Sequence, residues 1–499
     1  MKFNLISTHV ILCMNMALID KNLLPSLKFI DSLRRMKKIS VQGIPFMENR
    51  QIGFSKEQNK FTLRFKTQVA EYASVESAKI SNLPEFSFLH NNRSYTIPNE
   101  MSRIVKHHDN AWDGSSNDFS IDVDACTIYS SKIDITRKYY FRYFVPVDKR
   151  VNFEDYDHYV FLCQGKQAGS LIKIIIPENE IHLFHFEYKK EYYLVIESTK
   201  QCYLKDIEDI AYASLLTLGF FSRTLHLQET YIIASKSIGY SSPIGLYYKS
   251  LRESITGQYS IFTTNSYSVL IPIARKMKAK NAEDRMMKII HDKWGFRIER
   301  VKEDVFSEMT NIFHKNEPVA RAALISLTAS KLGLELQSAV YCIAFETICN
   351  FINKTYDLQA PHIIDETEWL IILPSLLDVL NKSSLSKEAM SFAKNKINNL
   401  NQPTNKDKLT LSFSAVGYNL SNEEIKAIND RNLFLHGHLN VKSGEKEIDK
   451  LFYTSLMFHR LCCTLILKMS GFNGHIVNNI PLYAPDINVK TNEWGFKKI

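Results

Sequence analysis

The sequence predicts an α+β protein, with a β-rich antiparallel N-terminal part followed by an all-helical C-terminal part. From about residue 59 to residue 251, short runs rich in Tyr, Phe, Ile and Val alternate with polar residues, which is typical of antiparallel strands. From about residue 274, apolar residues recur at helical spacing instead. The 499 residues are 45% hydrophobic and 23% charged, so both parts can bury a core.

The change of period also predicts the domain borders. We expect a loosely ordered N-terminal extension at 1–46, a β-rich domain at 47–273 and a helical domain at 274–499. The first eighteen residues are fairly apolar, but polar residues interrupt them and no small-residue cleavage site follows. They therefore predict neither a signal peptide nor a membrane span. We expect a cytoplasmic protein with no membrane contact.

Alternating apolar and polar residues define the strands of the first half. The segment 181–197 is long enough for two strands, and Lys189 and Lys190 predict a hairpin turn within it. One helix interrupts the strands, with Asp206 near its start and an apolar face that follows. The predicted strands are 61–65, 119–129, 138–147, 158–163, 171–176, 181–197, 231–234 and 245–248.

Apolar residues at helical spacing define the elements of the second half. The segment 318–354 should form either two helices or one helix with a weak point at Gly333. Residues 401–408 are polar and contain Pro403, which predicts a loop. The predicted helices are 282–294, 302–314, 318–354, 366–381, 387–399, 421–429 and 447–470.

Charge and motif content exclude several classes of protein. There are 62 Lys and Arg residues against 53 Asp and Glu, a net charge of +9, which permits an acidic partner such as nucleic acid without requiring one. The chain has no P-loop, no dinucleotide-binding glycine motif, no HExxH helix and no GxSxG elbow. Its eight cysteines form no CxxC pair, which argues against a zinc ribbon and fits a reducing compartment.

Two residue pairs in the strand-like half have suitable side chains for a metal ion but the wrong surroundings. Asp122 and Asp124 share one face of a strand, yet no third ligand is near in sequence. His182 and His185 are three residues apart and should point to opposite faces. We therefore expect no metal ion and no cofactor.

The segment 429–438, with the sequence NDRNLFLHGH, combines residues suited to RNA cleavage. His436 can act as base or acid near neutral pH, and Arg431 keeps its charge and can donate two hydrogen bonds to a phosphate. Asn432 and His436 are four residues apart, so on a helix they share a face and Asn432 can orient the imidazole. Arg431 lies about 140° from that face on an ideal helix.

This segment and its surroundings resemble the HEPN superfamily of ribonucleases, in its Apea-like branch. The likeness covers about 319–477: a core helix at 334–354 with an embedded glutamate, an Arg-Asn pair followed by His-Gly, and a long helix ending near a Gly-Phe turn. One more residue separates Asn from His than in the shortest form of this element. The resemblance implies a HEPN-like helical bundle and a metal-independent endoribonuclease with Arg431, Asn432 and His436 as catalytic residues. Its products would be 2′,3′-cyclic phosphate and 5′-hydroxyl ends.

The resemblance also implies partners and a role. HEPN ribonucleases pair so that two motifs face one cleft, which implies a homodimer acting on an RNA substrate. An unregulated ribonuclease would poison its cell, so we interpret the N-terminal domain as a regulator that binds a phage-derived or cellular trigger. Apea-like proteins resemble abortive-infection effectors, which implies antiviral defence.

Several alternatives stay open at this point. His438 also fits the spacing, and it either supports His436 or is an exposed turn residue. Glu346 either pairs with Arg431 and fixes its rotamer or belongs to a polar stripe facing water. The alternative to an enzyme is a non-catalytic HEPN-type module that binds RNA or protein; a third option is a β half that binds carbohydrate or protein beside a helical half that only dimerises. Two further Arg–His pairs match the spacing without the context: Arg103 with His108, and Arg285 with His291.

Overall fold

The chain forms two compact units, a β-rich one and a helical one, and the predicted α+β class is confirmed. The β-rich unit comprises Met1–Gly219, Thr224–Thr256 and Arg300–His314, and the helical unit Phe220–Arg223, Gly257–Glu299 and Lys315–Ile499. The computed structural model describes residues 19–42, 52–57, 60–68, 85–98, 102–109, 118–130, 132–177, 179–250, 253–276, 281–294, 298–435, 445–484 and 493–499.

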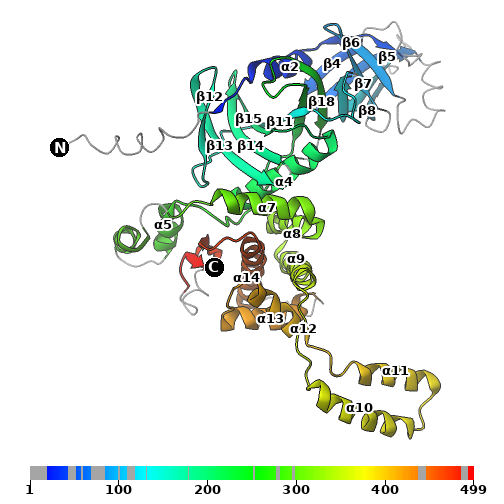
Figure 1. Ribbon diagram of the computed structural model, residues 1–499, viewed down its shortest axis with the longest axis vertical. Helices are drawn as coiled ribbons and strands as arrows, with labels where there is room; N and C mark the ends of the chain where they lie inside the picture. The colour runs from blue at the N-terminus through cyan, green and yellow to red at the C-terminus, as the bar shows by residue number, and fades with distance from the viewer. Residues whose placement is uncertain are drawn as a thin grey trace. The chain divides into compact units, whose positions relative to one another are not determined.

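A twelve-stranded sheet is the main layer of the β-rich unit (Figure 1). Neighbouring strands are antiparallel, apart from the first pair at one edge, which is parallel. In spatial order the strands are β1 (Ile19–Asp20), β12 (Tyr159–Cys163), β13 (Lys166–Ile176), β14 (Asn179–Tyr188), β15 (Glu191–Ser198), β11 (Tyr140–Val147), β17 (Glu229–Ser235), β18 (Pro243–Ser250), β10 (Thr127–Ser130), β7 (Arg93–Ile97), β6 (Phe86–His90) and β3 (Val41–Gln42).

Among its described residues, this unit also contains a second, five-stranded antiparallel sheet, three helices and a short pair of strands. The five strands are β2 (Lys38–Ile39), β4 (Ile52–Glu57), β5 (Lys60–Gln68), β9 (Asp118–Ala125) and β8 (Ser102–Asp109), and the short pair is β16 (Thr224–Leu225) with β19 (Ile255–Thr256). The helices are α2 (Leu24–Arg34), α4 (Leu204–Ser222) and α7 (Glu303–Lys315).

The predicted hairpin near residue 189 is confirmed. β14 and β15 pair as far as Tyr188 opposite Glu191, and the two residues between them, Lys189 and Lys190, have φ of 52° and 67°. Both lie in the left-handed region, so the turn has the twist that a two-residue hairpin requires. Two lysines adopt here a conformation that usually favours Asn and Gly, because the long strand pairing on both sides fixes the turn.

The unit borders differ from the expected ones. Residues 19–42, expected in a loose extension, form β1, α2, β2 and β3 of the β-rich unit. Helix α2 has Pro25 in its first turn and buries Leu27, Ile30 and Leu33, a helical spacing that binds it to the core. Helix α7, expected in the helical domain, counts with the β-rich unit, where Thr310 bonds to Thr217 of α4 at 3.1 Å.

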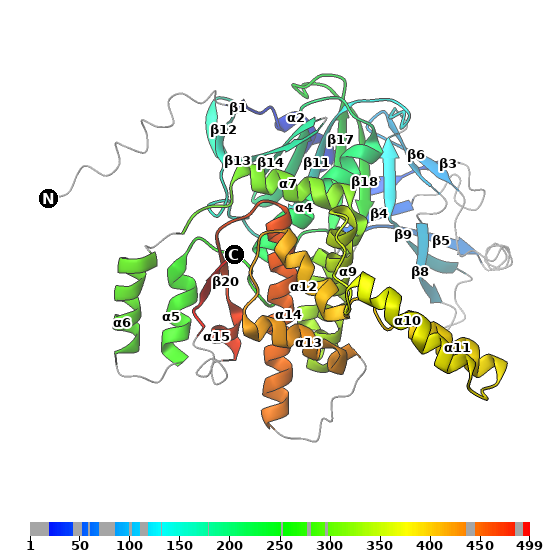
Figure 2. The ribbon, with the colours of Figure 1, turned by 60° about the horizontal axis from the view of Figure 1, so that its bottom comes forward.

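The helical unit is built around α9, which packs against α8, α12, α13 and α14 (Figure 2). Its elements are α5 (Ser266–Lys276), α6 (Ala282–Ile289), the π-helix η3 (Ile290–Trp294), α8 (Glu317–Thr328), the 3₁₀ turn η4 (Ala329–Lys331), α9 (Leu334–Thr355), α10 (Glu366–Asn381), α11 (Lys387–Asn398), α12 (Asn405–Ala415), α13 (Asn422–Leu435), α14 (Glu445–Met469), β20 (His475–Val477), α15 (Asn479–Tyr483) and β21 (Phe496–Lys498).

Of the two alternatives for the segment 318–354, the structure has two helices, because α8 ends before Gly333 and α9 begins directly after it. The loop predicted at 401–408 is wrong in its second part: Thr404 caps α12 by accepting the N–H of Asp407, so the helix begins at Asn405. Helix α5 was not predicted from the sequence, and it contains Pro272 in its interior. In the part of the chain that the structure describes, no helix has the length and apolar character needed to cross a membrane.

Candidate functional site

Arg431 lies on the face of α13 that is turned toward the core. Up to Asn432, where the described side chains of this helix end, its buried residues are Glu424, Ala427, Ile428 and Arg431, at spacings of three, four and seven. This is the stripe that an amphipathic helix normally fills with apolar side chains. A charged side chain at such a position needs an ionic partner, because an unpaired buried charge is very costly.

Glu346 of α9 provides that partner. Its Oε1 accepts a hydrogen bond from Nε of Arg431 at 2.7 Å, and the two side chains are 34% and 6% exposed. Of the two interpretations of Glu346, the structure therefore agrees with the one in which Glu346 pairs with Arg431. Burial, and to a lesser extent Glu346 itself, raises the pKa of the neighbouring Cys342 to about 12, so this thiol stays protonated.

Asn432 is the exposed neighbour of Arg431 on α13. Adjacent helical residues point about 100° apart, which is why one side chain enters the core and the other faces solvent. His436 and His438 lie outside the described residues, and α13 is described up to Leu435, directly before His436. Within the described residues the structure thus brings Arg431 and Glu346 together and leaves Asn432 beside them.

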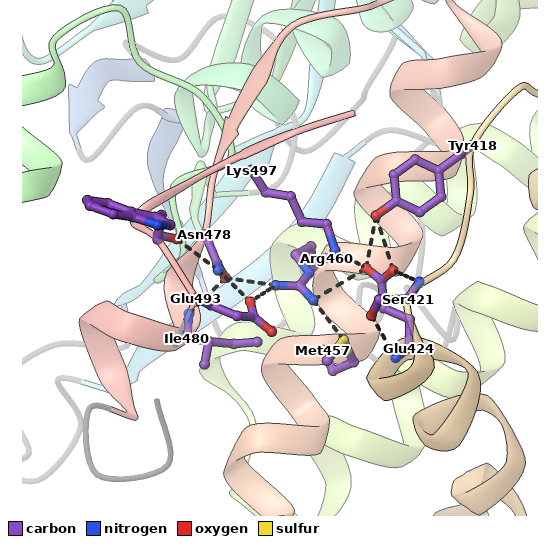
Figure 3. Close-up of polar contacts among 10 residues, drawn as sticks. Tyr418, Ser421, Glu424, Met457, Arg460, Asn478, Ile480, Glu493 and Lys497 are labelled. Atoms are coloured by element: carbon purple, nitrogen blue, oxygen red, sulfur yellow. Dashed lines mark hydrogen bonds and ion pairs between the residues drawn. The ribbon is translucent and has the colours of Figure 1, made fainter. Parts of the chain in front are cut away.

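A second charged network holds the first turn of α13, and sequence reasoning missed it. Figure 3 shows its members: Tyr418, Ser421, Glu424, Arg460, Asn478, Glu493 and Lys497. Glu424 accepts from Arg460 at 3.3 Å and from Lys497 at 2.7 Å. Arg460 of α14 also bonds to Glu493 and, at 3.0 Å, to Asn478. Two cations face two carboxylates, so the network is balanced in charge.

This network fixes where α13 begins. Burial pushes the pKa of Glu424 upward, but Arg460 and Lys497 outweigh it and hold that pKa below its ordinary value. Glu424 therefore stays ionised, and its Oε2 accepts the N–H of Ser421 at 2.9 Å, at the helix start. With Glu424 held at one end and Arg431 at the other, α13 has a charged anchor in its first turn and another near its last. The only sign of this network in the sequence was Glu424 itself, at a helix position that normally carries a buried apolar residue.

The alternative Arg–His pairs have other surroundings. Arg103 and His108 lie in the strand β8. Arg285 and His291 are exposed on α6 and η3, and Nδ1 of His291 contacts Asp292 at 3.0 Å. Unlike Arg431, Arg285 and His291 are therefore not buried.

In the two residue pairs considered for metal binding, the described side chains contact other residues instead. Oδ1 of Asp124 accepts a hydrogen bond from Thr62 at 2.8 Å. His182 contacts Lys21 and Glu180, while His185 packs beside Tyr192 with ring centroids 5.4 Å apart. Among the described residues, no three His, Cys, Asp or Glu side chains are grouped so that they could hold a metal ion.

Comparison with known proteins gives no relative for the chain. No family model, no curated protein and no solved structure matches it.

Proposed function

We propose that this chain is a metal-independent endoribonuclease of the HEPN type, with Arg431, Asn432 and His436 as its catalytic residues. The observation that carries the proposal is the ion pair between Arg431 and Glu346, 2.7 Å long. It fixes a guanidinium beside the exposed Asn432, which comes four residues before His436 in the sequence. Within the described residues, the Nη nitrogens of Arg431 have no hydrogen-bond partner, so they are available to a phosphate oxygen.

The chemistry needs no metal in this proposal. His436 takes the proton of the ribose 2′-hydroxyl, whose oxygen attacks the adjacent phosphorus. The P–O5′ bond breaks, the leaving 5′-oxygen takes a proton from water, and a 2′,3′-cyclic phosphate remains; the protonated imidazole then returns its proton to solvent. Arg431 stabilises the charge that develops on the phosphoryl oxygens. Glu346 acts as a positioning residue, because it holds the guanidinium without touching the substrate.

One observation favours a second candidate, a non-catalytic module that binds RNA or protein. The side chain of Arg431 is only 6% exposed and shares the buried face of α13 with Ile428. An arginine in that place also suits a purely structural role, in which the ion pair joins α13 to α9. Both candidates keep the N-terminal domain as the part that binds a phage-derived or cellular trigger in antiviral defence.

The homodimer belongs to the same proposal, and the hairpin of α10 and α11 suits it. The hairpin extends away from α9 and α12–α14 in both views (Figure 2). α10 is rich in Leu and Ile, yet Trp369 is its one buried residue and α11 has none. Ile371 is 75% exposed and Val379 71%. An apolar helix this exposed normally packs against a partner.

The charges of the hairpin favour a second copy as that partner. α10 carries Glu366, Glu368 and Asp378 and no basic residue, whereas α11 carries three lysines and one acidic residue. Under a two-fold axis, α10 of one copy can pack against α11 of the other with opposite charges facing. Packing α10 on its own copy would bring acidic residues together.

The proposed activity is tested with the purified full-length chain and a panel of RNAs in EDTA. We expect cleavage, with products that carry 2′,3′-cyclic phosphate and 5′-hydroxyl ends. Glu346→Gln should lower kcat by about tenfold with little change in KM, because it weakens the hold on Arg431 without touching RNA. RNA that is bound but never cut, by wild type and variant alike, would favour the binding module. Cleavage that requires added metal would contradict the proposal.

A further inference from the structure

The β-rich unit contains a second buried cluster of charges, which lies under a pocket. Arg142 of β11 and Lys21 beside β1 both bond to Glu197 of β15: Lys21 through Nζ to Oε1 at 2.6 Å, Arg142 through Nε to Oε2. The side chains of Arg142 and Glu197 are 1% and 3% exposed. Nη1 of Arg142 donates to the carbonyl of Asn22. Two buried cations thus share one buried carboxylate.

His182 does not balance the extra positive charge. Burial, and then the neighbouring Lys21, lowers the pKa of His182, so the ring is neutral near pH 7. Its Nδ1 accepts from Nζ of Lys21 at 2.6 Å, and its Nε2 lies 2.7 Å from Glu180. Glu180 and Asp20 are further carboxylates near the cluster, but both reach solvent, where water and salt screen them. Among the residues that the structure describes, one positive charge in the buried cluster therefore has no buried counterpart.

The pocket above the cluster has the size of a small-molecule site. Its volume is about 610 Å³, within the range of such sites. Tyr240 covers one face of the Arg142 guanidinium, with the ring centroid 3.9 Å from Cζ. The Nη2 of Arg142 has no hydrogen-bond partner among the described residues. The lining residues are Ile19, Asp20, Lys21, Asn22, Arg142, Gln164, His182, Glu197, Thr199, Ile238 and Gly239.

We propose that this pocket binds a small monocarboxylic acid with a short apolar tail. The carboxylate bonds to the unused edge of the Arg142 guanidinium and supplies the missing negative charge. The tail lies against Ile19 and Ile238, the apolar residues of the lining. A single negative charge matches the single excess positive charge, which a phosphate with nearly two charges would exceed. The site shares no residue with the proposed ribonuclease site, so either can fail alone.

The test is a titration of the purified full-length chain with hexanoate, followed by calorimetry and by the melting temperature. Hexan-1-ol, which has the tail without the charge, and inorganic phosphate, which has charge without a tail, are the comparison probes. We expect hexanoate to bind and raise the melting temperature, and each comparison probe to bind at least about tenfold more weakly. Equal binding of hexan-1-ol, preferred binding of phosphate, or no binding of hexanoate at millimolar concentration would overturn the proposal.

A rim variant locates the site without disturbing the buried cluster. Ile238 is 53% exposed, so Ile238→Asp should fold and place a like charge beside the ligand. It should weaken hexanoate about tenfold. Ile135→Asp is the matched control, since Ile135 is 62% exposed in the same unit and does not line the pocket. If Ile238→Asp binds hexanoate as the wild type does, the acid binds elsewhere and the proposal is wrong.

Discussion

Each unit of this protein buries an arginine among carboxylates, and the two networks differ in their charge balance. In the helical unit, Arg460 and Lys497 face Glu424 and Glu493. In the β-rich unit, Lys21 and Arg142 share Glu197. The balanced network joins a helix to the C-terminal strand β21. The unbalanced one lies at the floor of a pocket.

This difference in charge balance distinguishes buried charges that stabilise the fold from buried charges that bind a ligand. A buried ion pair is costly to assemble, and it is most damaging when one partner is missing. Evolution of a purely structural network should therefore balance its charges, as around Arg460. An excess of positive charge beside a pocket indicates that a negatively charged ligand neutralises it. We therefore propose that the site at Arg142 binds an anion.

The largest expected effect is on the balanced network. Arg460→Met leaves Glu424, which is fully buried, without its arginine and should lower the free energy of unfolding of the helical unit by about 3–5 kcal/mol. Urea unfolding followed by circular dichroism measures this. Arg275→Met is the matched control: Arg275 pairs with Glu283 on the surface, and its loss should cost no more than about 1 kcal/mol. Equal costs for the two variants would contradict the structural role.

The pH dependence of stability gives an effect of similar size. Burial lowers the pKa of His459 in α14 to about 4, between the rings of Tyr259 and Tyr341. At low pH the unfolded chain binds a proton at His459 that the native state does not bind. The free energy of unfolding therefore falls as the pH drops from 6.5 toward 4. The loss should reach about 3 kcal/mol at pH 4. His459→Phe should flatten the pH profile of urea unfolding, while the exposed His314→Phe should not; equal profiles for all three proteins would contradict the assignment.

Removing single charges from the two networks sharpens the comparison. In the unbalanced network, Glu197→Gln should cost about 3 kcal/mol because it leaves two buried cations together. Lys21→Met should cost only about 1 kcal/mol, since Arg142 and Glu197 remain as a pair. In the balanced network, removing either sign should cost similar amounts. The free energies of unfolding of these variants test whether the charges are unbalanced. Equal losses of stability for Glu197→Gln and Lys21→Met would remove the argument for an external anion.

The smallest expected effect concerns the hairpin of α10 and α11. Ile371→Asp should weaken self-association at least about tenfold without lowering the melting temperature, because Ile371 is exposed in the single chain. Leu336→Asp is the control, an exposed leucine outside the hairpin. Glu368→Lys and Lys396→Glu should each weaken the dimer, and the double variant should recover it. A monomeric wild type by sedimentation, or a dimer unaffected by Ile371→Asp, would contradict this interface.

Much of the fold follows from local patterns in the sequence. Alternation along 181–197 predicted β14, β15 and their turn, and Gly333 indicated a weak point where the structure separates α8 from α9. The failures have local causes too. Among the helices that were not predicted are α2, which has Pro25 in its opening turn, and α5, which has Pro272 inside it, where tertiary packing of Leu270 and Ile273 outweighs the cost.

The candidate site was predictable only in part. The pairing of Arg431 with Glu346 was one of two interpretations, and the choice depended on which face of α13 turns toward α9. The network around Arg460 joins residues up to 73 positions apart, and the cluster at Arg142 joins Lys21 to Glu197, 176 positions away. Such contacts depend on the order of strands and the packing of helices, which no local spacing encodes.

The most direct test of the proposed ribonuclease compares His436→Ala with the wild type in a bacterial host, with soluble expression matched and RNA integrity followed with and without phage. We expect RNA cleavage to fall about 100-fold or more in His436→Ala, and Asn432→Ala to weaken it as well. The double variant Arg285→Ala with His291→Ala changes the exposed pair of similar spacing and should cleave as the wild type does. RNA breakdown or phage protection that is unchanged in His436→Ala would contradict the central claim.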